Sequence, residues 1–486
     1  MSQLNIRFIF KMLGLMFILE FLFVLVAIAV AFYYKGDDVY PLSQTAGIML
    51  GLGMLFYLIG FKANERYAGR REGMITVALT WAVLSFLGML PFYLGGYITN
   101  PADAYFETMS GYTTTGATIL SDIEALPKGI LFWRSLLQWQ GGVGMIVFTV
   151  ALMPIFGGGA SELFDAESAS ITHDRFRPRI TQVAKRLWGV YVFLTGILVL
   201  LLWAGPMDLF DAVCHSFTTL ATGGYSTKNA SVAYWNSPYV EYMITIFMFI
   251  GAINFTLIYF FFKGNFKKLF HDEELRWFFF IAVGAISIAT SWVYFNGFET
   301  DFETSFRKAT FQVMTCLTTT GFATADYVPW GPFFWLLALM LMIICGCAGS
   351  TTGGLKTGRF VILVKSLLSE FKKQTHPHAV IPVRMDGHAV PVDIVRRVLV
   401  FSFVYVFMIA VCCFLLTLNG VGFEEAIGGC VSCASNSGPA LGTIGPVSNY
   451  SSLPDFSKWV LSFLMMTGRL EIFTVLSLFL PGFWKQ

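Results

Sequence analysis

The sequence TTTGF at residues 318–322 has relatives at three other places in the chain. These are TTTGA at residues 113–117, ATGGY at 221–225 and NSGP at 436–439. Each run follows a segment that is too short to cross a bilayer, and each precedes a long apolar segment. The short segments are 103–112, 211–220, 308–317 and 425–434. Repetition of one such unit predicts four equivalent turns around a single axis.

The second run contains two glycines, and the spacing decides which of them corresponds to the single glycine of the other runs. In the other three units an alanine lies twelve residues before the glycine, and Ala212 lies twelve residues before Gly224. Gly224 is therefore predicted as the equivalent glycine, with Gly223 as its predecessor. Glycine is needed because carbonyl groups can point inward side by side only in backbone conformations that a Cβ disfavours.

The short segments favour cation binding at these turns. Ten helical residues rise about 15 Å, half the hydrocarbon thickness, so each half-helix is expected to end near the membrane middle with its partially negative C-terminus at the axis. The turns contain Thr, Ser and Asn but no carboxylate, which suits a monovalent ion held mostly by backbone carbonyls, with K+ the leading candidate. The predicted ligands are Thr114, Thr115, Gly116, Thr222, Gly223, Gly224, Thr319, Thr320, Gly321, Asn436, Ser437 and Gly438. Thr-Gly pairs also occur in ordinary loops, but their fourfold recurrence favours a pore.

The composition assigns the chain to a membrane. Hydrophobic residues make up 56% and charged residues 13% of the sequence, which is not the balance of a soluble protein. Ten spanning segments are expected. They are Phe8–Phe32, Pro41–Phe61, Met74–Tyr97, Ile130–Phe156, Arg186–Trp203, Tyr239–Phe262, Arg276–Phe295, Gly331–Leu368, Ile394–Leu418 and Ser457–Leu480. The first is too long for a signal-peptide core and is expected to remain as a helix.

Lysine and arginine set the expected orientation. With a cytoplasmic N-terminus, most of the 32 basic residues lie in inside segments. Both termini are therefore predicted inside, and the four turns are predicted to lie toward the outer face. The net charge of +2 reflects this topology, and nothing in it indicates nucleic-acid binding.

The pattern divides the chain into five parts. Residues 1–73 are expected to form an N-terminal hairpin of two helices outside the repeat, and four pore repeats follow at about 74–159, 160–264, 265–375 and 376–486. The predicted fold is an all-α membrane protein in which each repeat is a helix, a half-length pore helix, a filter turn and a helix. The longer cytoplasmic links, 157–185 and 374–393, are either solvated loops or docking surfaces for a soluble partner.

The closing segment of the third repeat differs from the others. Residues 331–368 are interrupted by CGCAGSTTGGLK at 345–356, and non-helical backbone at membrane depth is tolerated only beside protein or a water-filled cavity. A flexible loop below the filter can block the pore and move aside. The predicted gating residues are Gly346, Ala348, Gly349, Ser350, Thr351, Thr352, Gly353, Gly354 and Lys356. Close packing of small residues between helices is the alternative.

Arg469 lies in the middle of the last apolar segment, where a guanidinium needs a partner or a water-filled cavity. Facing the pore below the filter, it would repel cations or hold the gating loop, so we predict it to be a pore barrier. Glu471 is an unsuitable partner because residues i and i+2 of a helix do not face each other. Glu20, His215 and Asn254 are weaker candidates, interpreted as polar groups with local partners.

Neither metal-dependent nor catalytic chemistry is indicated. Cys430 and Cys433 lack a second pair of ligands, so the eight cysteines are expected to be reduced and structural, and no organic cofactor is expected. The six histidines are scattered, which argues against a membrane enzyme. A proton- or sodium-coupled transporter would need ionisable residues along its path, and only Arg469 and Glu20 qualify.

These motifs together resemble the Trk/Ktr/HKT superfamily of potassium transporters, specifically its TrkH type. The resemblance extends over nearly all of the chain and rests on the four turns, on GCAGST at residues 346–351 and on GRLEIF at residues 468–473. One glycine per repeat implies fewer carbonyl rings than in potassium channels, and therefore looser discrimination. Members of the superfamily with serine at the first turn tend to favour sodium, whereas this chain has Gly116.

The resemblance implies a function and partners. K+, together with Rb+, is expected to enter across a bacterial inner membrane through a gated, channel-like pore that is selective over Na+. The resemblance further implies a homodimer within membrane lipid that docks a cytosolic TrkA-like regulatory ring binding NAD(H) or ATP/ADP. The alternative function is a symporter that couples cation entry to H+ or Na+.

Overall fold

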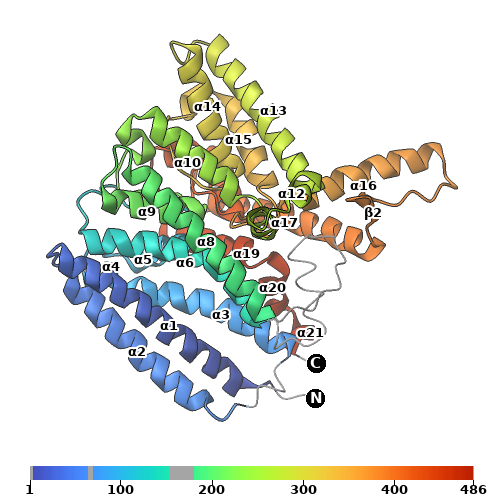
Figure 1. Ribbon diagram of the computed structural model, residues 1–486. Helices are drawn as coiled ribbons and strands as arrows, with labels where there is room; N and C mark the ends of the chain where they lie inside the picture. Colours follow the sequence, from blue (N-terminus) through green and yellow to red (C-terminus); the bar gives the residue numbers. More distant parts are fainter. Residues whose placement is uncertain (1–3, 64–68, 153–179, 485–486) are drawn as a thin grey trace.

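The computed structural model describes residues 4–63, 69–152 and 180–484, and most of the regular structure in these ranges is helical (Figure 1). The first helices are α1 (Ile6–Tyr33), α2 (Val39–Gly60), α3 (Arg70–Gly88), α4 (Leu90–Leu94), α5 (Pro101–Tyr112), α6 (Lys128–Leu152), α8 (Ile180–Trp203), α9 (Leu209–Leu220), α10 (Pro238–Gly251) and α11 (Phe255–Phe262). They are followed by α12 (Phe266–His271), α13 (Glu273–Phe295), α14 (Phe302–Leu317), α15 (Pro332–Ile344), α16 (Thr357–Thr375), α17 (Val392–Leu418), α18 (Phe423–Ser435), α19 (Asp455–Arg469), α20 (Ile472–Leu476) and α21 (Pro481–Trp484). Short 3-10 helices are η3 (Ser231–Trp235), η4 (Val328–Trp330), η5 (Gly442–Ile444) and η6 (Ser477–Phe479), and β1 (Arg384–Met385) pairs antiparallel with β2 (His388–Ala389).

Most of the apolar segments that were predicted to span the membrane form single long helices. In the described ranges six helices are long and apolar enough to cross a membrane, and the number rises to eight if each of two bent helix pairs is one span. Their outer faces carry large exposed apolar side chains, such as Phe32 on α1, Phe295 on α13 and Phe403 on α17. Faces of this kind suit lipid rather than water, so the expected all-α membrane fold is confirmed.

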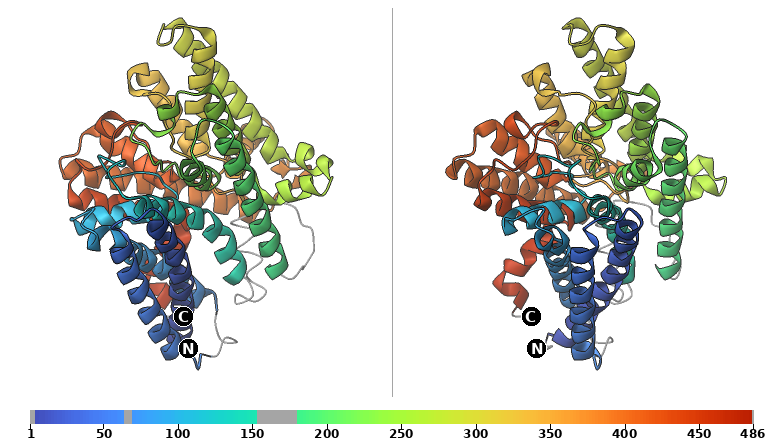
Figure 2. Two further views of the ribbon diagram at one scale, coloured as in Figure 1. Left: turned by 60° about the vertical axis from the view of Figure 1, so that its left-hand side comes forward. Right: turned by 90° about the vertical axis from the view of Figure 1, so that its left-hand side faces the viewer.

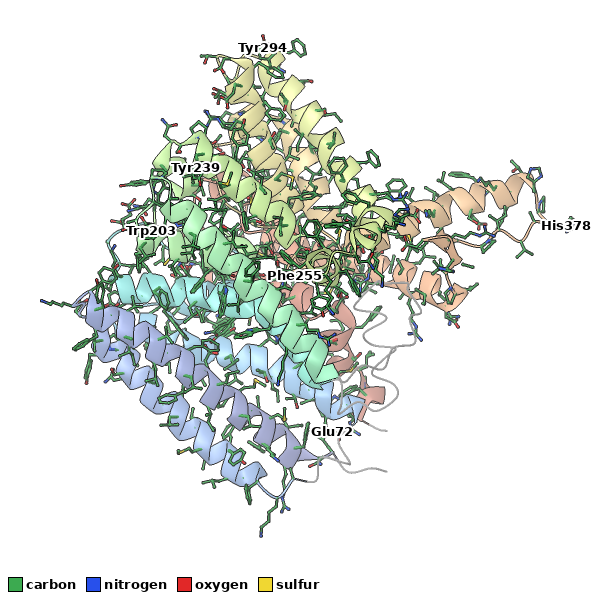
Figure 3. The ribbon with its side chains drawn as sticks, in the orientation of Figure 1. Glu72, Trp203, Tyr239, Phe255, Tyr294 and His378 are labelled. Carbon is green, nitrogen blue, oxygen red and sulfur yellow. The ribbon has the colours of Figure 1, made fainter. Side chains whose placement is uncertain are left out.

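Aromatic side chains mark one end of the long helices. Trp203, Tyr239 and Tyr294, at the ends of α8, α10 and α13, lie along the upper and left margin of Figure 3. Glu72 and His378 lie at the lower and right margin of the same view. Trp and Tyr are typical of membrane–water interfaces, so the ends of α8, α10 and α13 that carry these three residues suit such an interface.

The N-terminal hairpin of α1 and α2 lies along one side of the molecule and packs next to α3 (Figures 1 and 2). Glu20 points inward from α1 and accepts a hydrogen bond from the hydroxyl of Tyr112, the last residue of α5, at 2.7 Å. At the start of the hairpin, the N–H of Asn5 donates to Glu72 at 3.2 Å, and the neighbouring Arg71 donates to the carbonyl of Trp484 at 3.4 Å. Both ends of the described chain therefore meet the first turn of α3.

Interruptions occur in three closing segments and not only in the third. α10 and α11 meet at 103° across residues 252–254, and α19 meets the α20–η6 segment at 116° across residues 470–471. The expectation of continuous helices over 239–262 and 457–480 was wrong. Asn254 starts α11 anew by accepting from the N–H of Thr256 at 2.8 Å, and Glu471 takes a φ of +61°. Single polar residues of this kind barely change the hydropathy of an apolar segment.

Of the two predicted cytoplasmic links, only the second lies wholly within the described residues. The first, 157–185, and the end of the predicted span 130–156 lie largely within 153–179, outside the described residues. The second, 374–393, contains the β1–β2 hairpin, whose turn residue Asp386 exchanges hydrogen bonds with Glu273 at the start of α13, at 2.8 and 2.9 Å. This link is therefore attached to a membrane-spanning helix.

Candidate functional site

Four half-length helices end in the interior of the molecule, as the repeated pattern predicts. They are α5, α9, α14 and α18, and they begin slightly earlier than expected, most clearly α14 at Phe302. Asn100, Asp208 and Asp301 explain three of these starts, because each side chain accepts a hydrogen bond from an N–H of the first helical turn. Pore helices of this length cannot cross a bilayer, and each leads directly into one of the predicted turns.

The four helices end in the same backbone conformation. In each, the residue before the turn glycine donates its N–H to the carbonyl five residues earlier: Thr115 to Ser110 (2.9 Å), Gly223 to Thr218 (2.8 Å), Thr320 to Thr315 (2.9 Å) and Ser437 to Ser432 (2.9 Å). The residue before each donor is left-handed, with φ of 54° at Thr114, 51° at Thr222, 53° at Thr319 and 57° at Asn436. Positive φ recurs two residues later, with 85° at Gly116, 78° at Gly224, 89° at Gly321 and 94° at Gly438.

The four turns form a closed ring. A Cβ built on each turn glycine would collide with a carbonyl oxygen of the next turn. In each case this oxygen belongs to the residue that precedes the glycine of that next turn. The distances are 2.1 Å from Gly116 to Gly223, 2.0 Å from Gly224 to Thr320, 2.3 Å from Gly321 to Ser437 and 2.6 Å from Gly438 to Thr115. Each turn therefore touches two neighbours around one axis, and the ring contains all of the predicted ligands.

Three of the ring glycines remain accessible to solvent. Gly116, Gly224 and Gly321 are partly exposed, although the residues on both sides of each are buried. In these three turns the accessible surface is thus centred on the glycine backbone, whereas Gly438 in the fourth turn is buried. A passage lined in this way presents peptide groups rather than side chains to an ion.

Side chains from neighbouring helices support the ring. Gln138 of α6 fills the place that a side chain at Gly223 would take, donating to the Gly223 carbonyl at 2.7 Å and accepting from the N–H of Tyr225 at 3.0 Å. Asn436 reaches across to Thr115 Oγ1 at 3.0 Å. Gln138 was not found from the sequence. Its polarity within an apolar segment is the feature that could have identified it.

The loop at residues 345–356 packs against the ring at the end where the half-helices stop. Thr351 Oγ1 donates to the carbonyl of Leu220 at 3.0 Å, and the N–H of Gly353 donates to Thr319 Oγ1 at 3.2 Å. A Cβ on Gly353 would lie 2.1 Å from the carbonyl oxygen of Ser435. The loop therefore contacts the second, third and fourth turns directly.

The interruption between α10 and α11 holds this loop. Cys347 donates its N–H to the carbonyl of Ala252 at 2.9 Å, Phe255 donates to the carbonyl of Gly349 at 3.1 Å, and Thr351 donates to the carbonyl of Gly251 at 3.3 Å. The break that the sequence did not reveal thus supplies backbone groups for the loop. Within the loop, Ser350 and Thr352 join their hydroxyls at 2.8 Å, Gly354 has a φ of +65°, and Lys356 donates to the Thr352 carbonyl.

Glu274 fastens the two ends of the loop. Its Oε1 accepts from the N–H of Ala348 at 2.7 Å and from the N–H of Gly358 at 2.8 Å, while the carbonyl of Gly346 accepts from Thr357 at 2.9 Å. Glu274 is buried in the first turn of α13. This role could not be predicted from the sequence, because acidic residues in a first helical turn are common for electrostatic reasons alone.

Arg469 is 1% exposed and links the loop to the first repeat. Nη1 donates to the carbonyl of Thr351 at 2.6 Å, and Nη2 donates to the carbonyl of Gly141 in α6 at 2.9 Å. Glu471 forms an ion pair with Arg359 of α16 at 2.9 Å, so it is engaged elsewhere. Arg469 therefore contacts both the loop and α6, and its role as a pore barrier stays a prediction.

Metal-binding side chains do not gather in the described part of the chain. Its residues include no group of three His, Cys, Asp or Glu side chains placed to hold a metal ion. All eight cysteines are free, and Cys430 and Cys433 are buried in α18. His215 instead bonds the carbonyl of Asp211 at 2.8 Å and the hydroxyl of Ser226 at 3.0 Å, as expected for a polar group with local partners.

Several membrane spans combined with four half-helices that end in one ring are the architecture of transport proteins of the pore-loop class. The family of cation transport proteins called TrkH matches residues 55–485. The Trk system potassium uptake protein TrkH of Salmonella typhimurium is 37% identical over 492 residues, which cover 99% of this chain and 100% of that protein. The corresponding protein of Halomonas elongata is 35% identical with the same coverage.

The same relationship holds in three dimensions. The crystal structure of the potassium transporter TrkH from Vibrio parahaemolyticus superimposes with a TM-score of 0.89 at 35% identity, covering 99% of this chain and 100% of that one. The chain belongs to the TrkH family. It is accordingly a transport protein and not an enzyme, and the predicted family is confirmed.

Proposed function

We propose that this protein takes up K+, together with Rb+, through one pore whose filter is the ring of four turns. The observation that carries the proposal is the closed contact of each turn glycine with the carbonyl of the next turn. Backbone oxygens arranged around one axis can replace the hydration shell of a monovalent cation. The relatives named as potassium uptake proteins support K+ as the ion.

The gate in this proposal is the loop at residues 345–356 together with Arg469. The loop meets three of the turns, and Arg469 connects the loop to α6 of the remaining repeat, so that all four sides of the passage are covered. The positive charge of Arg469 adds an electrostatic barrier to the steric one. Opening requires the loop to leave the turns while the filter remains intact.

The remaining features of the proposal concern assembly and orientation. The protein lies in the bacterial inner membrane with both termini in the cytoplasm, which agrees with the distribution of basic residues and with the two chain ends meeting at α3. It forms a homodimer, and a cytosolic nucleotide-binding subunit of the TrkA kind controls the gate. The relatives' designation as parts of a Trk system supports a partner subunit.

Uptake in cells tests this proposal. The chain is expressed in bacteria that lack their own K+ uptake systems, and growth at low K+ and uptake of radioactive Rb+ are measured. We expect growth to be restored and Rb+ uptake to be inhibited by K+ but weakly by Na+. Correctly inserted protein that restores neither growth nor Rb+ uptake would contradict the assignment.

A further inference from the structure

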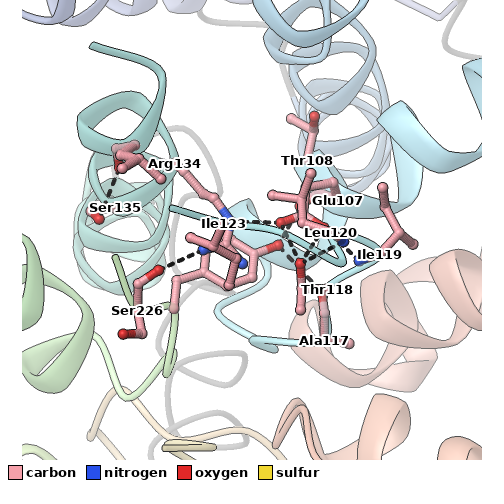
Figure 4. Close-up of polar contacts among 12 residues, drawn as sticks. Glu107, Thr108, Ala117, Thr118, Ile119, Leu120, Ile123, Arg134, Ser135 and Ser226 are labelled. Atoms are coloured by element: carbon pink, nitrogen blue, oxygen red, sulfur yellow. Dashed lines mark hydrogen bonds and ion pairs between the residues drawn. The ribbon is translucent and has the colours of Figure 1, made fainter. Parts of the chain in front are cut away.

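Glu107 lies in the first half-helix, nine residues before Gly116, and its side chain is 1% exposed. Both carboxylate oxygens accept from the hydroxyl of Thr118 at 3.0 Å, and Oε2 also accepts from the N–H of Ile119 at 2.9 Å (Figure 4). Thr118 and Ile119 belong to the non-helical segment that follows the first turn. Glu107 therefore fixes the position of the backbone immediately after Gly116.

Arg134 of α6 pairs with this carboxylate and reaches the second turn. Its Nε lies 2.6 Å from Glu107 Oε1, and Nη1 donates to the carbonyl of Ser226 at 2.9 Å (Figure 4). The guanidinium also lies 3.6 Å from the centre of the Tyr225 ring, and the Tyr225 hydroxyl donates to the backbone carbonyl of Glu107 at 2.6 Å. Tyr225 and Ser226 directly follow Gly224. One ion pair thus holds the exits of two neighbouring turns.

Residues at the equivalent position in two other repeats also contact the segment that follows their own turn. Nine residues before the turn glycines stand His215, Gln312 and Gly429. His215 contacts the hydroxyl of Ser226 at 3.0 Å, and Gln312 donates to the carbonyl of Ala325 at 2.9 Å. Three half-helices therefore hold the segment that follows their own turn. Of the three contacting residues, only Glu107 is paired with an opposite charge.

Stability alone does not account for a buried ion pair at this place. Removing two charges from water is costly, and an apolar pair of similar volume often packs equally well or better. An apolar pair cannot, however, accept from the Thr118 hydroxyl and the Ile119 N–H or donate to the Ser226 carbonyl. Charge-assisted hydrogen bonds are also shorter and stronger than neutral ones, which limits movement of the backbone they hold.

We propose that Glu107 and Arg134 are positioning residues that set the ion selectivity of the pore by fixing the backbone that follows Gly116 and Gly224. The inference rests on the proposed function of the ring as a filter. Rigid spacing of the carbonyls at two of the four turns disfavours a smaller ion, which would require the turns to move closer together. Loosening of this pair lets the two turns adjust and admits Na+.

The test compares three variants in proteoliposomes, with reversal potentials measured under opposed K+ and Na+ gradients. The first is the apolar double variant E107M/R134M, and the second is Glu107→Gln, which keeps the shape and an acceptor oxygen. The third is the control E241M/R307M, because Glu241 and Arg307 form another inter-repeat ion pair, at 2.8 Å between α10 and α14. Monodispersity in detergent and the thermal unfolding temperature are recorded for every variant.

We expect E107M/R134M to lose roughly tenfold in K+ preference over Na+, the change that corresponds to one charge-assisted hydrogen bond. Glu107→Gln should lose less, and E241M/R307M should keep the preference of the unmodified protein. Unchanged selectivity in folded E107M/R134M would overturn the inference. If the double variant does not fold, unchanged selectivity in Glu107→Gln would overturn it instead. An equal loss in E241M/R307M would overturn it as well. If the unmodified protein does not discriminate between the ions, the filter proposal fails and this inference fails with it.

Discussion

At the residue scale, the decisive feature is a glycine that cannot carry a side chain for two separate reasons. Gly116 has a φ of +85°, which L-residues rarely adopt, and a Cβ there would lie 2.1 Å from the carbonyl oxygen of Gly223. Gly438 has a φ of +94°, and a Cβ there would lie 2.6 Å from the carbonyl oxygen of Thr115. A larger residue at either position must therefore displace the carbonyl group of the neighbouring turn.

Gly116→Ser and Gly438→Ser are therefore expected to weaken the preference for K+ over Na+. The added Cβ and hydroxyl push the facing carbonyl away and change the size of the ring. Competition of Na+ and Rb+ against K+ flux measures the effect. Gly420→Ser is the matched control, because Gly420 also has a positive φ but a Cβ there meets nothing within 4 Å. Unchanged selectivity in both ring variants would remove these residues from the filter.

Arg469 permits a second prediction at this scale. A fixed positive charge beside the path opposes a cation by several kcal/mol in a region of low dielectric constant, and by about 1 kcal/mol in a wet cavity. Arg469→Ala should therefore raise K+ flux by about fivefold in a wet cavity and by more in a region of low dielectric constant. Arg469→Lys should raise it far less, because the charge is retained. Single-channel conductance and monodispersity are measured together, and a stable alanine variant with normal conductance and gating would contradict the assignment.

At the scale of elements, the interrupted segments act as a set. The α10–α11 break binds the loop through backbone hydrogen bonds, the α19–α20 break follows Arg469, and the loop itself separates α15 from α16. Non-helical backbone at membrane depth is stable here because each interruption satisfies the polar groups of another. Movement of the loop therefore exposes polar groups of the α10–α11 break and of Arg469.

Deletion of residues 349–353 should raise ion flux and make it independent of a regulatory subunit. The deletion removes the contacts that Thr351 and Gly353 make with the ring and leaves the four turns in place. Flux is measured in proteoliposomes with and without the partner subunit. Loss of flux in a folded, inserted deletion variant would favour the alternative in which the loop only packs between helices.

Substitution of Glu274 should disturb the loop less than deletion of residues 349–353 does. Glu274→Gln and Glu274→Ala remove the negative charge that accepts from Ala348 and Gly358, so the loop should leave the ring more often and basal flux should rise several-fold. Glu273→Gln is the control, since Glu273 contacts Lys365 and Asp386 and not the loop. If the Glu274 variants and Glu273→Gln have the same basal flux, Glu274 does not hold the loop in place.

At the scale of the whole molecule, the repeat could be predicted from the sequence because its features are local. In each repeat the short helix, the left-handed residue and the turn glycine lie within about twenty consecutive residues. The breaks at residues 252–254 and 470–471 could not be predicted, because their stabilising partners lie elsewhere in the chain. Hydropathy averages over such isolated polar residues.

The partners of the site were the least predictable part. Arg469 was identified as anomalous, but its bond to Gly141 joins residues 328 positions apart, and the bond from Asn436 to Thr115 joins residues 321 apart. Glu107 and Arg134 stand out only after the helices are placed, since a single charge in a short segment suits an outer loop equally well. Contacts of this kind are set by how the four repeats close around one axis.

The central claim is that the ring of four turns is a selective pore which conducts without coupling to another gradient. Flux of K+ through the purified protein in liposomes, driven by a K+ gradient alone at equal pH and equal Na+ on both sides, tests it most directly. We expect K+ and Rb+ to flow until the membrane reaches the K+ equilibrium potential, with much smaller flux of Na+. Flux that requires a gradient of H+ or Na+, or that moves either ion in a fixed ratio to K+, would contradict the account.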